Sequence, residues 1–302
     1  MEINWRDRPE RGGRRITRFY IWLSLTVGRR LARPILYGIA LYFFVSAPAE
    51  RWASQDYLAR VLGRRPTLVQ RYRHFFIFCT LMMDKIFFLA SRTKDVSFSV
   101  HGAEVFESLV AEKKGFLLAS GHIGSFEALR ALGISEKKHP VKALIDVETS
   151  RRFYNMLRDI NPEVVDSVIP LGQPGTVLEI REWIDGGGVV GILADRSMSD
   201  DRVTPVDFLG APANFPLGPW LLASVLNVPV VLCFAVYSGK GHYDAYFELL
   251  SPAVSPERAK REDHARSLAI RFAARLEHFC RMTPYNWANL LNFWAKTDES
   301  NE

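Results

Sequence analysis

A histidine and a glutamate stand five positions apart in the segment SGHIGSFE, residues 120–127. His122 directly follows an apolar run of the kind that forms a buried strand. If His122 lies in the loop and Glu127 in the first turn of a following helix, the two side chains can meet. A carboxylate beside an imidazole fixes its tautomer and raises its basicity, so the imidazole can take a proton from an acceptor. The spacing alone also fits an ordinary loop histidine with satisfied hydrogen bonds.

The position of this segment favours a chemical role for His122. In α/β sheets, ligands bind at the carboxyl ends of the strands. Gly121 and Gly124 allow a tight turn and let a substrate approach the backbone. We therefore expect His122 and Glu127 to be catalytic, and Gly124 and Ser125 to contact substrate.

A second polar pair, Asp195 and Arg196, ends another apolar run at 189–194. An arginine at a strand end can hold a phosphate by a forked contact, although the pair can also simply close the strand as ions. We predict that both residues bind substrate. The glycine- and proline-rich stretch that continues to Pro219 is expected to be a long ordered loop, a type of segment that often carries function.

The pattern from residue 96 onwards alternates between strands and helices, which predicts an α/β fold: a mixed, mainly parallel sheet flanked by helices. We expect strands at 96–100, 115–120, 141–145, 168–171 and 189–194, a hairpin of 228–236 with 243–250, and helices at 103–112, 125–132, 150–159, 176–185, 221–226 and 257–281. Residues 96–302 are therefore expected to form the catalytic domain.

Residues 1–95 are expected to form a basic, hydrophobic helical region that associates with a membrane. Two apolar segments lie within 19–49, and arginines flank and interrupt them. Neither segment reaches the roughly 20 apolar residues that a spanning helix needs. We expect helices lying in the interface, with arginines on the headgroups. A single span and a soluble helical core are the alternatives, and a cleaved signal peptide fits less well because the basic region before the apolar run is long.

Composition narrows the classes of function. The 302 residues carry a net charge of +6, which favours an acidic partner such as anionic lipid. Nucleic acid is disfavoured, because the basic cluster is interleaved with apolar residues. The three cysteines have no CxxC spacing, so we expect buried free thiols and neither a disulfide framework nor a metal site. The segment PYNWANLLNFW, residues 284–294, is expected to pack onto the domain.

Taken together, these segments resemble the bacterial lipid A biosynthesis acyltransferases, the lauroyl and myristoyl transferases of the lysophospholipid acyltransferase superfamily. His122 to Glu127 is similar to the superfamily's H-x-x-x-x-[DE] motif. Asp195-Arg196 followed by FLGAPANFPLGP resembles a later block, and Asn227-Val-Pro229-Val the last one. The ending PYNW…NFW is similar to a subgroup beside aryl polyene pathways. The resemblance covers roughly residues 15–295, and Arg151 and Arg152 are the candidates for an arginine-containing acceptor block.

The resemblance implies acyl transfer from a thioester, on acyl carrier protein or coenzyme A, to a hydroxyl or amine of a lipid A-like, glycolipid or polyene-lipid acceptor. It implies a histidine general base with Glu127 as its orienting residue, and neither cofactor nor covalent intermediate, so that Ser125 would be a helix cap. It also implies the cytoplasmic face of a bacterial inner membrane. The net charge favours the carrier protein, which is strongly acidic.

Three other functions remain open at the level of sequence. One is an acyl-coenzyme A-dependent lysophospholipid acyltransferase. Another is a lipid hydrolase, although Gly124-Ser125-Phe126 lacks the G-x-S-x-G pattern of a nucleophile elbow. The third is a membrane-binding protein that keeps the fold without catalysis, which the presence of both His122 and Glu127 disfavours.

Overall fold

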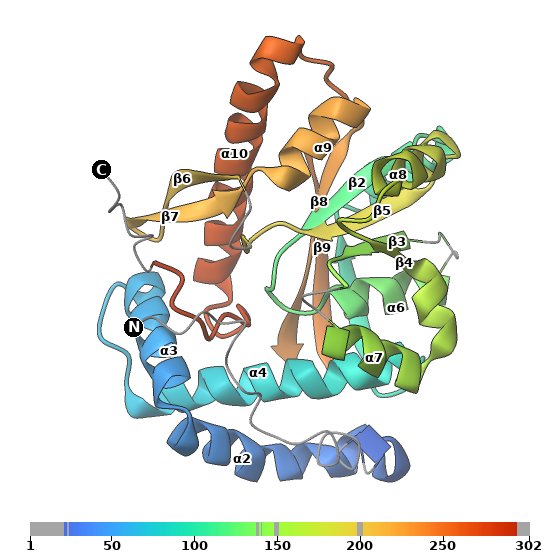
Figure 1. Cartoon of the computed structure of the whole chain (residues 1–302). Helices are drawn as coiled ribbons and strands as arrows, with labels where there is room; N and C mark the ends of the chain where they lie inside the picture. The colour runs from blue at the N-terminus through green and yellow to red at the C-terminus, as the bar shows by residue number, and fades with distance from the viewer. Residues whose placement is uncertain are drawn as a thin grey trace.

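A seven-stranded sheet forms the centre of the protein. The computed structural model describes residues 21–294, apart from 23, 137, 138, 140, 148–150 and 198–201. The strand order is β1-β9-β8-β2-β5-β3-β4. All neighbouring strands are parallel except β8 and β9, which confirms the predicted mixed, mainly parallel sheet (Figure 1). The strands are β1 (Ser97–His101), β2 (Phe116–Ser120), β3 (Val141–Ile145), β4 (Val168–Pro170), β5 (Val189–Leu193), β8 (Val230–Gly239) and β9 (His242–Ser251).

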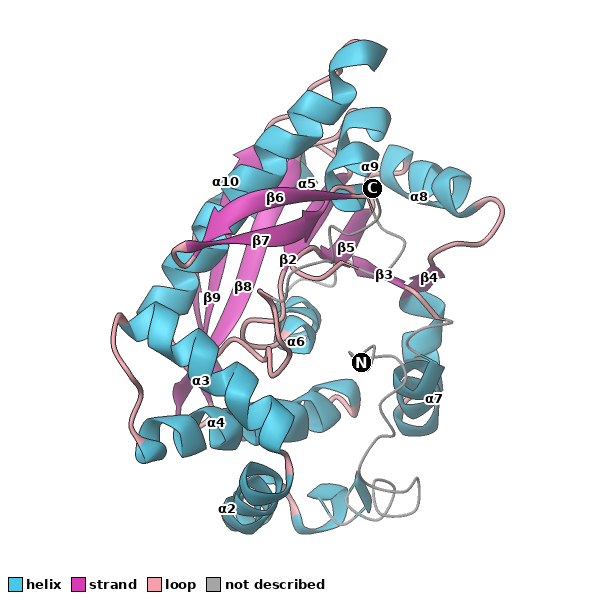
Figure 2. Ribbon diagram, turned by 60° about the vertical axis from the view of Figure 1, so that its left-hand side comes forward, coloured by secondary structure: helices cyan, strands magenta, loops and turns pink. Residues whose placement is uncertain are grey.

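Helices cover both faces of this sheet, because its central strands are apolar on both faces (Figure 2). In β2, Leu117 and Ala119 face one core, which includes residues of α8 (Thr176–Asp185), α9 (Gly218–Leu226) and α10 (Arg261–Met282). Phe116 and Leu118 face a second core, to which α4 (Leu68–Leu89), α5 (Ala103–Ala111) and α6 (Phe126–Glu136) contribute. The remaining helical segments near the sheet are α7 (Arg151–Ile160) and two short 3-10 turns, η2 (Pro162–Ser167) and η3 (Arg258–Lys260).

Helices α2 (Arg29–Ser46) and α3 (Pro48–Leu62) precede α4. Helix α2 lies along α4, which joins it to the rest of the protein (Figure 1). Between residues 21 and 294, leaving aside the gaps named above, no single helix is long and apolar enough to cross a bilayer. Helices α2 and α3 meet that criterion only as a pair, and the pair is bent by 97°.

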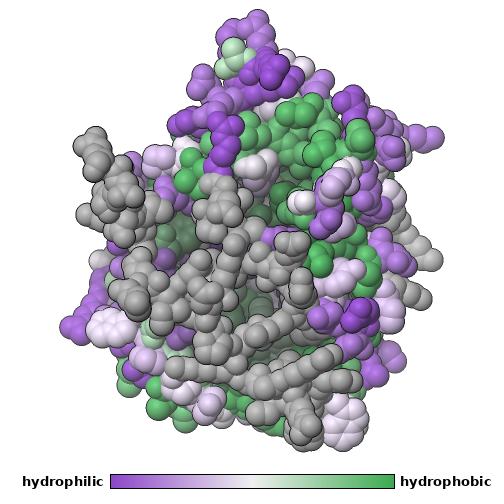
Figure 3. Space-filling view, in the orientation of Figure 1, coloured by the Kyte–Doolittle hydropathy of each residue, from purple (hydrophilic) through white to green (hydrophobic). Residues whose placement is uncertain are grey.

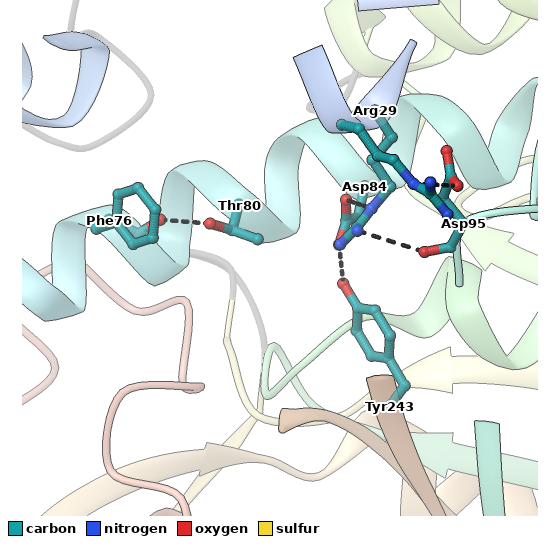
Figure 4. Close-up of polar contacts among 7 residues, drawn as sticks. Arg29, Phe76, Thr80, Asp84, Asp95 and Tyr243 are labelled. Carbon is teal, nitrogen blue, oxygen red and sulfur yellow. Dashed lines mark hydrogen bonds and ion pairs between the residues drawn. The ribbon is translucent and has the colours of Figure 1, made fainter. Parts of the chain in front are cut away.

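A buried ion pair fixes the start of α2. The Arg29 guanidinium donates from Nε and Nη2 to the two carboxylate oxygens of Asp84, at 2.7 Å each. The Tyr243 hydroxyl of β9 donates to Asp84 Oδ2 at 2.7 Å. Figure 4 shows these side chains converging from α2, α4 and the sheet. Three separate segments of the chain are therefore tied together at one point.

The stretch that was expected to be a long loop up to Pro219 instead contains a hairpin, β6 (Val203–Phe208) with β7 (Ala211–Pro216). The prediction was wrong because prolines in the sequence suggested irregular structure. In an isolated two-stranded ribbon, each strand has one edge without a neighbouring strand. A proline whose nitrogen faces that edge removes no hydrogen bond between the strands. Leu209 and Gly210, with φ of 51° and 79°, form the two-residue turn that such hairpins favour.

Candidate active site

His122 and Asp195 meet because β2 and β5 are adjacent parallel strands. Ser120 at the end of β2 is opposite Leu193 at the end of β5, so the loops that follow emerge side by side. His122 Nδ1 lies 2.7 Å from Asp195 Oδ1, and the His122 backbone N–H donates to Asp195 Oδ2 at 2.9 Å. Gly121 lies beside this carboxylate, where an added Cβ would be 3.2 Å from the carboxyl carbon of Asp195.

The pair has the electrostatics of a general base and its orienting carboxylate. Asp195 is fully buried, whereas the His122 side chain keeps 31% of its surface exposed. Burial and the nearby Arg196 cation lower the pKa of His122 below 6.5, against the opposing effect of Asp195. Burial opposes ionisation of Asp195, but its contacts with His122 outweigh that effect and hold its pKa well below the usual range. An ionised Asp195 therefore accepts the Nδ1 proton, which leaves Nε2 of a neutral His122 unprotonated.

The structure places the Glu127 carboxylate beside Lys85 and Ser125, and the orienting role that the sequence suggested for Glu127 stays a prediction. Its carboxylate lies 2.6 Å from Lys85 Nζ of α4 and accepts a hydrogen bond from Ser125 Oγ at 3.2 Å. The reason is geometric: Glu127 stands in the first turn of α6, whereas Asp195 leaves the neighbouring strand directly beside His122. Asp195, predicted as a substrate ligand, is therefore the carboxylate that contacts the His122 ring.

Gly124 and Ser125 shape the turn between His122 and α6. Gly124 has φ of 65°, and an added Cβ would be 1.7 Å from the Ala235 carbonyl oxygen, so the turn requires glycine. Ser125 Oγ accepts from the Ala128 backbone N–H at 3.3 Å, which confirms that Ser125 caps α6. Contact of either residue with substrate stays a prediction.

The predicted arginines occupy different surroundings. Arg196 Nη2 donates to the Ala288 carbonyl at 2.6 Å, and its buried Nε has no hydrogen-bond partner among the described residues. Arg151 and Arg152 begin α7, but their side chains lie outside the described part of the structure. Lys85 and Arg196 both lower the pKa of His122, so two cations stand near the imidazole. Sequence reasoning missed Lys85, because it lies within an apolar helix far from the motif.

The segment 284–294 packs onto the domain as expected. The Asn286 side chain accepts from the Tyr237 N–H at 2.6 Å and donates to the Tyr237 carbonyl at 3.1 Å. Trp287 is completely buried, and its indole N–H donates to Asp195 Oδ2 at 3.0 Å. The tail thus reaches the site itself, a contact that the sequence analysis did not predict.

Among the residues that the structure describes, no three or more His, Cys, Asp or Glu side chains are grouped to hold a metal.

The fold and the site together define an α/β protein with a histidine–aspartate pair at the carboxyl edge of its sheet. Within that class, residues 7–296 match the family described as bacterial lipid A biosynthesis acyltransferase. Since the match covers nearly the whole chain, the protein belongs to this family and is an acyltransferase. A comparison with individual curated proteins gives no match.

Proposed function

We propose that the protein transfers a fatty acyl chain from an acyl thioester, with acyl carrier protein as the favoured donor, to a hydroxyl or amine of a lipid A-like, glycolipid or polyene-lipid acceptor. The observation that carries this proposal is the hydrogen bond between His122 Nδ1 and the buried carboxylate of Asp195. Membership of the lipid A acyltransferase family supports the reaction class. An acyl-coenzyme A-dependent lysophospholipid acyltransferase is the alternative.

In the proposed mechanism, neutral His122 is the general base. Its unprotonated Nε2 takes the proton from the acceptor O–H or N–H as the oxygen or nitrogen attacks the thioester carbonyl. The new C–O or C–N bond forms, the C–S bond breaks, and the imidazolium returns its proton to the departing thiolate. Asp195 stabilises the imidazolium throughout, and its ionised state is favoured by the His122 contacts described above. The enzyme needs no covalent intermediate.

The cations near His122 support an anionic substrate. Arg196 has a buried Nε without a partner among the described residues, and a buried donor of this kind is costly unless something accepts from it. A phosphate is a suitable acceptor for a guanidinium. Both the prosthetic arm of a carrier protein and a phosphorylated lipid provide one, so this feature supports the substrate class and does not separate donor from acceptor.

The outward side of α2 supports membrane association. Six side chains there are 43–69% exposed although they are apolar or aromatic: Leu31, Ile35, Tyr37, Leu41, Tyr42 and Val45. We call this surface the outer face of α2. The opposite side of the helix is buried against α4. Figure 3 shows hydrophobic side chains along the lower edge of the molecule, where Figure 1 draws α2. A surface helix that is apolar on both sides is typical of a protein that rests on lipid.

The test uses purified protein and one radiolabelled acyl chain, carried either by acyl carrier protein or by coenzyme A. A lipid extract of cells that lack the gene provides the acceptors. We expect labelled lipid with the wild-type protein, and a rate about 10² to 10⁴ lower with His122→Ala. The matched control is His101→Ala. This variant also removes a histidine that pairs with an aspartate, Asp244, but His101 lies on β1 at the edge of the sheet.

The outcomes separate the parts of the proposal. Undiminished transfer by a folded His122→Ala protein would exclude the general-base mechanism. Equal or faster transfer from the coenzyme A donor at equal concentration would exclude the preference for carrier protein but not acyl transfer. Because carrier proteins are acidic and this chain has a net charge of +6, the rate at low carrier-protein concentration should fall as salt is raised.

A further inference from the structure

Residues 286–288 lie against the loop that carries His122. Ile123 and Trp287 form an antiparallel bridge, and the Gly124 N–H donates to the Asn286 carbonyl at 2.9 Å. The Ala288 N–H donates to the His122 carbonyl at 2.6 Å. Backbone on both sides of the catalytic histidine is therefore held by a segment more than 160 positions later in the chain.

We infer that Trp287 is a positioning residue for acyl transfer, whose indole N–H fixes the carboxylate of Asp195 and through it the His122 ring. This inference rests on the proposed function. Asp195 Oδ2 accepts two hydrogen bonds, one from the indole at 3.0 Å and one from the His122 backbone at 2.9 Å. Oδ1 is thereby turned towards His122 Nδ1, at 2.7 Å. Without the indole, one of the two bonds that orient the carboxylate is lost, and Oδ2 becomes under-satisfied inside the protein.

The Trp287 side chain and backbone are held in place by helices α3 and α4 and by the β6–β7 hairpin. Its ring lies 4.9 Å from the ring of Tyr57 on α3 and 5.4 Å from that of Phe208 on β6. The backbone carbonyl of Trp287 lies 2.9 Å from His74 Nε2 of α4, and His74 Nδ1 lies 2.9 Å from Ser54 Oγ of α3. The wall behind the catalytic pair is therefore built from α3, α4 and the hairpin.

The protonation of His74 follows from these contacts. A carbonyl oxygen only accepts, so Nε2 must carry the proton, and Nδ1 accepts from the Ser54 hydroxyl. Burial lowers the pKa of His74 to about 4, which keeps the ring neutral near pH 7. A neutral His74 thus makes two directed hydrogen bonds that hold the backbone of Trp287.

The experiment compares Trp287→Phe with Trp294→Phe. Trp294 is a matched control, because it belongs to the same aromatic cluster and its indole also donates a hydrogen bond, but to the Phe208 carbonyl at 3.1 Å. We expect Trp287→Phe to lower kcat about 10- to 100-fold, with KM for donor and acceptor unchanged, because the carboxylate is misplaced. Trp294→Phe should leave kcat within about twofold at a comparable Tm. In an Asp195→Asn background, Trp287→Phe should have little further effect.

A second readout does not depend on turnover. In histidine ¹⁵N-labelled protein, the His122 signals, assigned by their loss in His122→Ala, should report the Nδ1–H tautomer in the wild type and a mixture in Trp287→Phe. This separates failure of the inference from failure of the proposed function, since the tautomer is observed even if no acceptor is turned over. An unchanged tautomer with unchanged kcat in folded Trp287→Phe would overturn the inference.

If Trp287→Phe does not fold, His74 provides the test. His74→Gln can keep a donor towards the Trp287 carbonyl, whereas His74→Leu cannot. We expect kcat to be lower in the leucine variant than in the glutamine variant, with the same KM values. Equal kcat in the two folded variants, each with the wild-type tautomer at His122, would contradict the role of Trp287.

Discussion

The carboxylate that contacts the His122 ring belongs to Asp195, 73 positions away in the chain, whereas Glu127, five positions away, contacts Lys85 and Ser125. The sequence pattern identified the histidine correctly as a residue at a strand end, because a buried apolar run directly precedes it. It did not identify the partner, because the adjacency of β2 and β5 is a property of the sheet order. Asp195 was recognised as a polar strand end, but its role depends on which strand lies beside it.

The pH dependence of turnover follows from the state of His122. The imidazole acts as a base only when neutral, and burial together with Arg196 lowers its pKa below 6.5. Activity should therefore be constant near neutral pH and fall as the pH decreases through this lowered pKa. The measurement is kcat/KM against pH with a non-titrating acceptor. An acid limb above pH 6.5 would mean that the imidazolium is stabilised in the free enzyme.

Glu127 should affect His122 through Lys85. In Glu127→Gln, the negative charge 2.6 Å from Lys85 Nζ is removed, so the Lys85 cation is less shielded and lowers the pKa of His122 further. The acid limb should move to lower pH and the maximal rate should fall, because a weaker base is left. Adding Lys85→Met should return the acid limb towards its wild-type position. If the limb does not move back, Glu127 acts on His122 by another route.

Asp195→Asn should lower activity by a different mechanism from Glu127→Gln. An asparagine amide at this position can donate to Nδ1, which favours the wrong tautomer of His122. The expected loss is about 10² to 10⁴ in kcat, as in other enzymes where an orienting aspartate is replaced. This loss should persist at high pH, where His122 is fully neutral. Recovery of the wild-type rate at high pH would show that only charge, not orientation, is lost.

At the scale of elements, most of the architecture follows from local pattern. The strand at 141–145 and the helix at 176–185 occur at their predicted bounds, since each has a clear apolar period and clear end signals. The hairpin turn predicted at SGKGH is confirmed. Lys240 and Gly241, both with positive φ, join β8 to β9. The β6–β7 hairpin was missed because Pro205, Pro212 and Pro216 interrupt its alternating pattern. Prolines are tolerated within a strand when they lie on an edge that has no neighbouring strand.

The attachment of α2 depends on the buried pair of Arg29 and Asp84. Replacing Asp84 with alanine leaves a buried guanidinium and the Tyr243 hydroxyl without their acceptor. We expect the free energy of unfolding to fall by about 3–5 kcal/mol, as for other buried pairs with one partner removed. Asp185→Ala is the control, because the Arg181–Asp185 pair on α8 is exposed and should contribute about 0–1 kcal/mol. Thermal or denaturant unfolding measures both, and equal losses would contradict a special role for this anchor.

At the scale of the whole molecule, the outer face of α2 is the surface to test for lipid binding. The double variant Leu41→Glu/Val45→Glu should bind vesicles of phosphatidylethanolamine and phosphatidylglycerol at least about tenfold more weakly. Two exposed apolar side chains are lost, and a loss of about 1.4 kcal/mol in binding free energy already gives a factor of ten. Val177→Glu/Leu178→Glu changes two equally exposed apolar residues on α8 and serves as the control. Equal binding by both folded variants would place the contact elsewhere.

The bridge between residues 286–288 and the His122 loop also has a consequence for the order in which the protein is made. Helices α2 to α4 leave the ribosome before the strands of the sheet. Asp195 receives its indole hydrogen bond only when Trp287 has emerged, after all seven strands and α10 have been synthesised. A nascent chain therefore presents the outer face of α2 long before its catalytic pair is complete. Acyl transfer would be the last property that the growing polypeptide acquires.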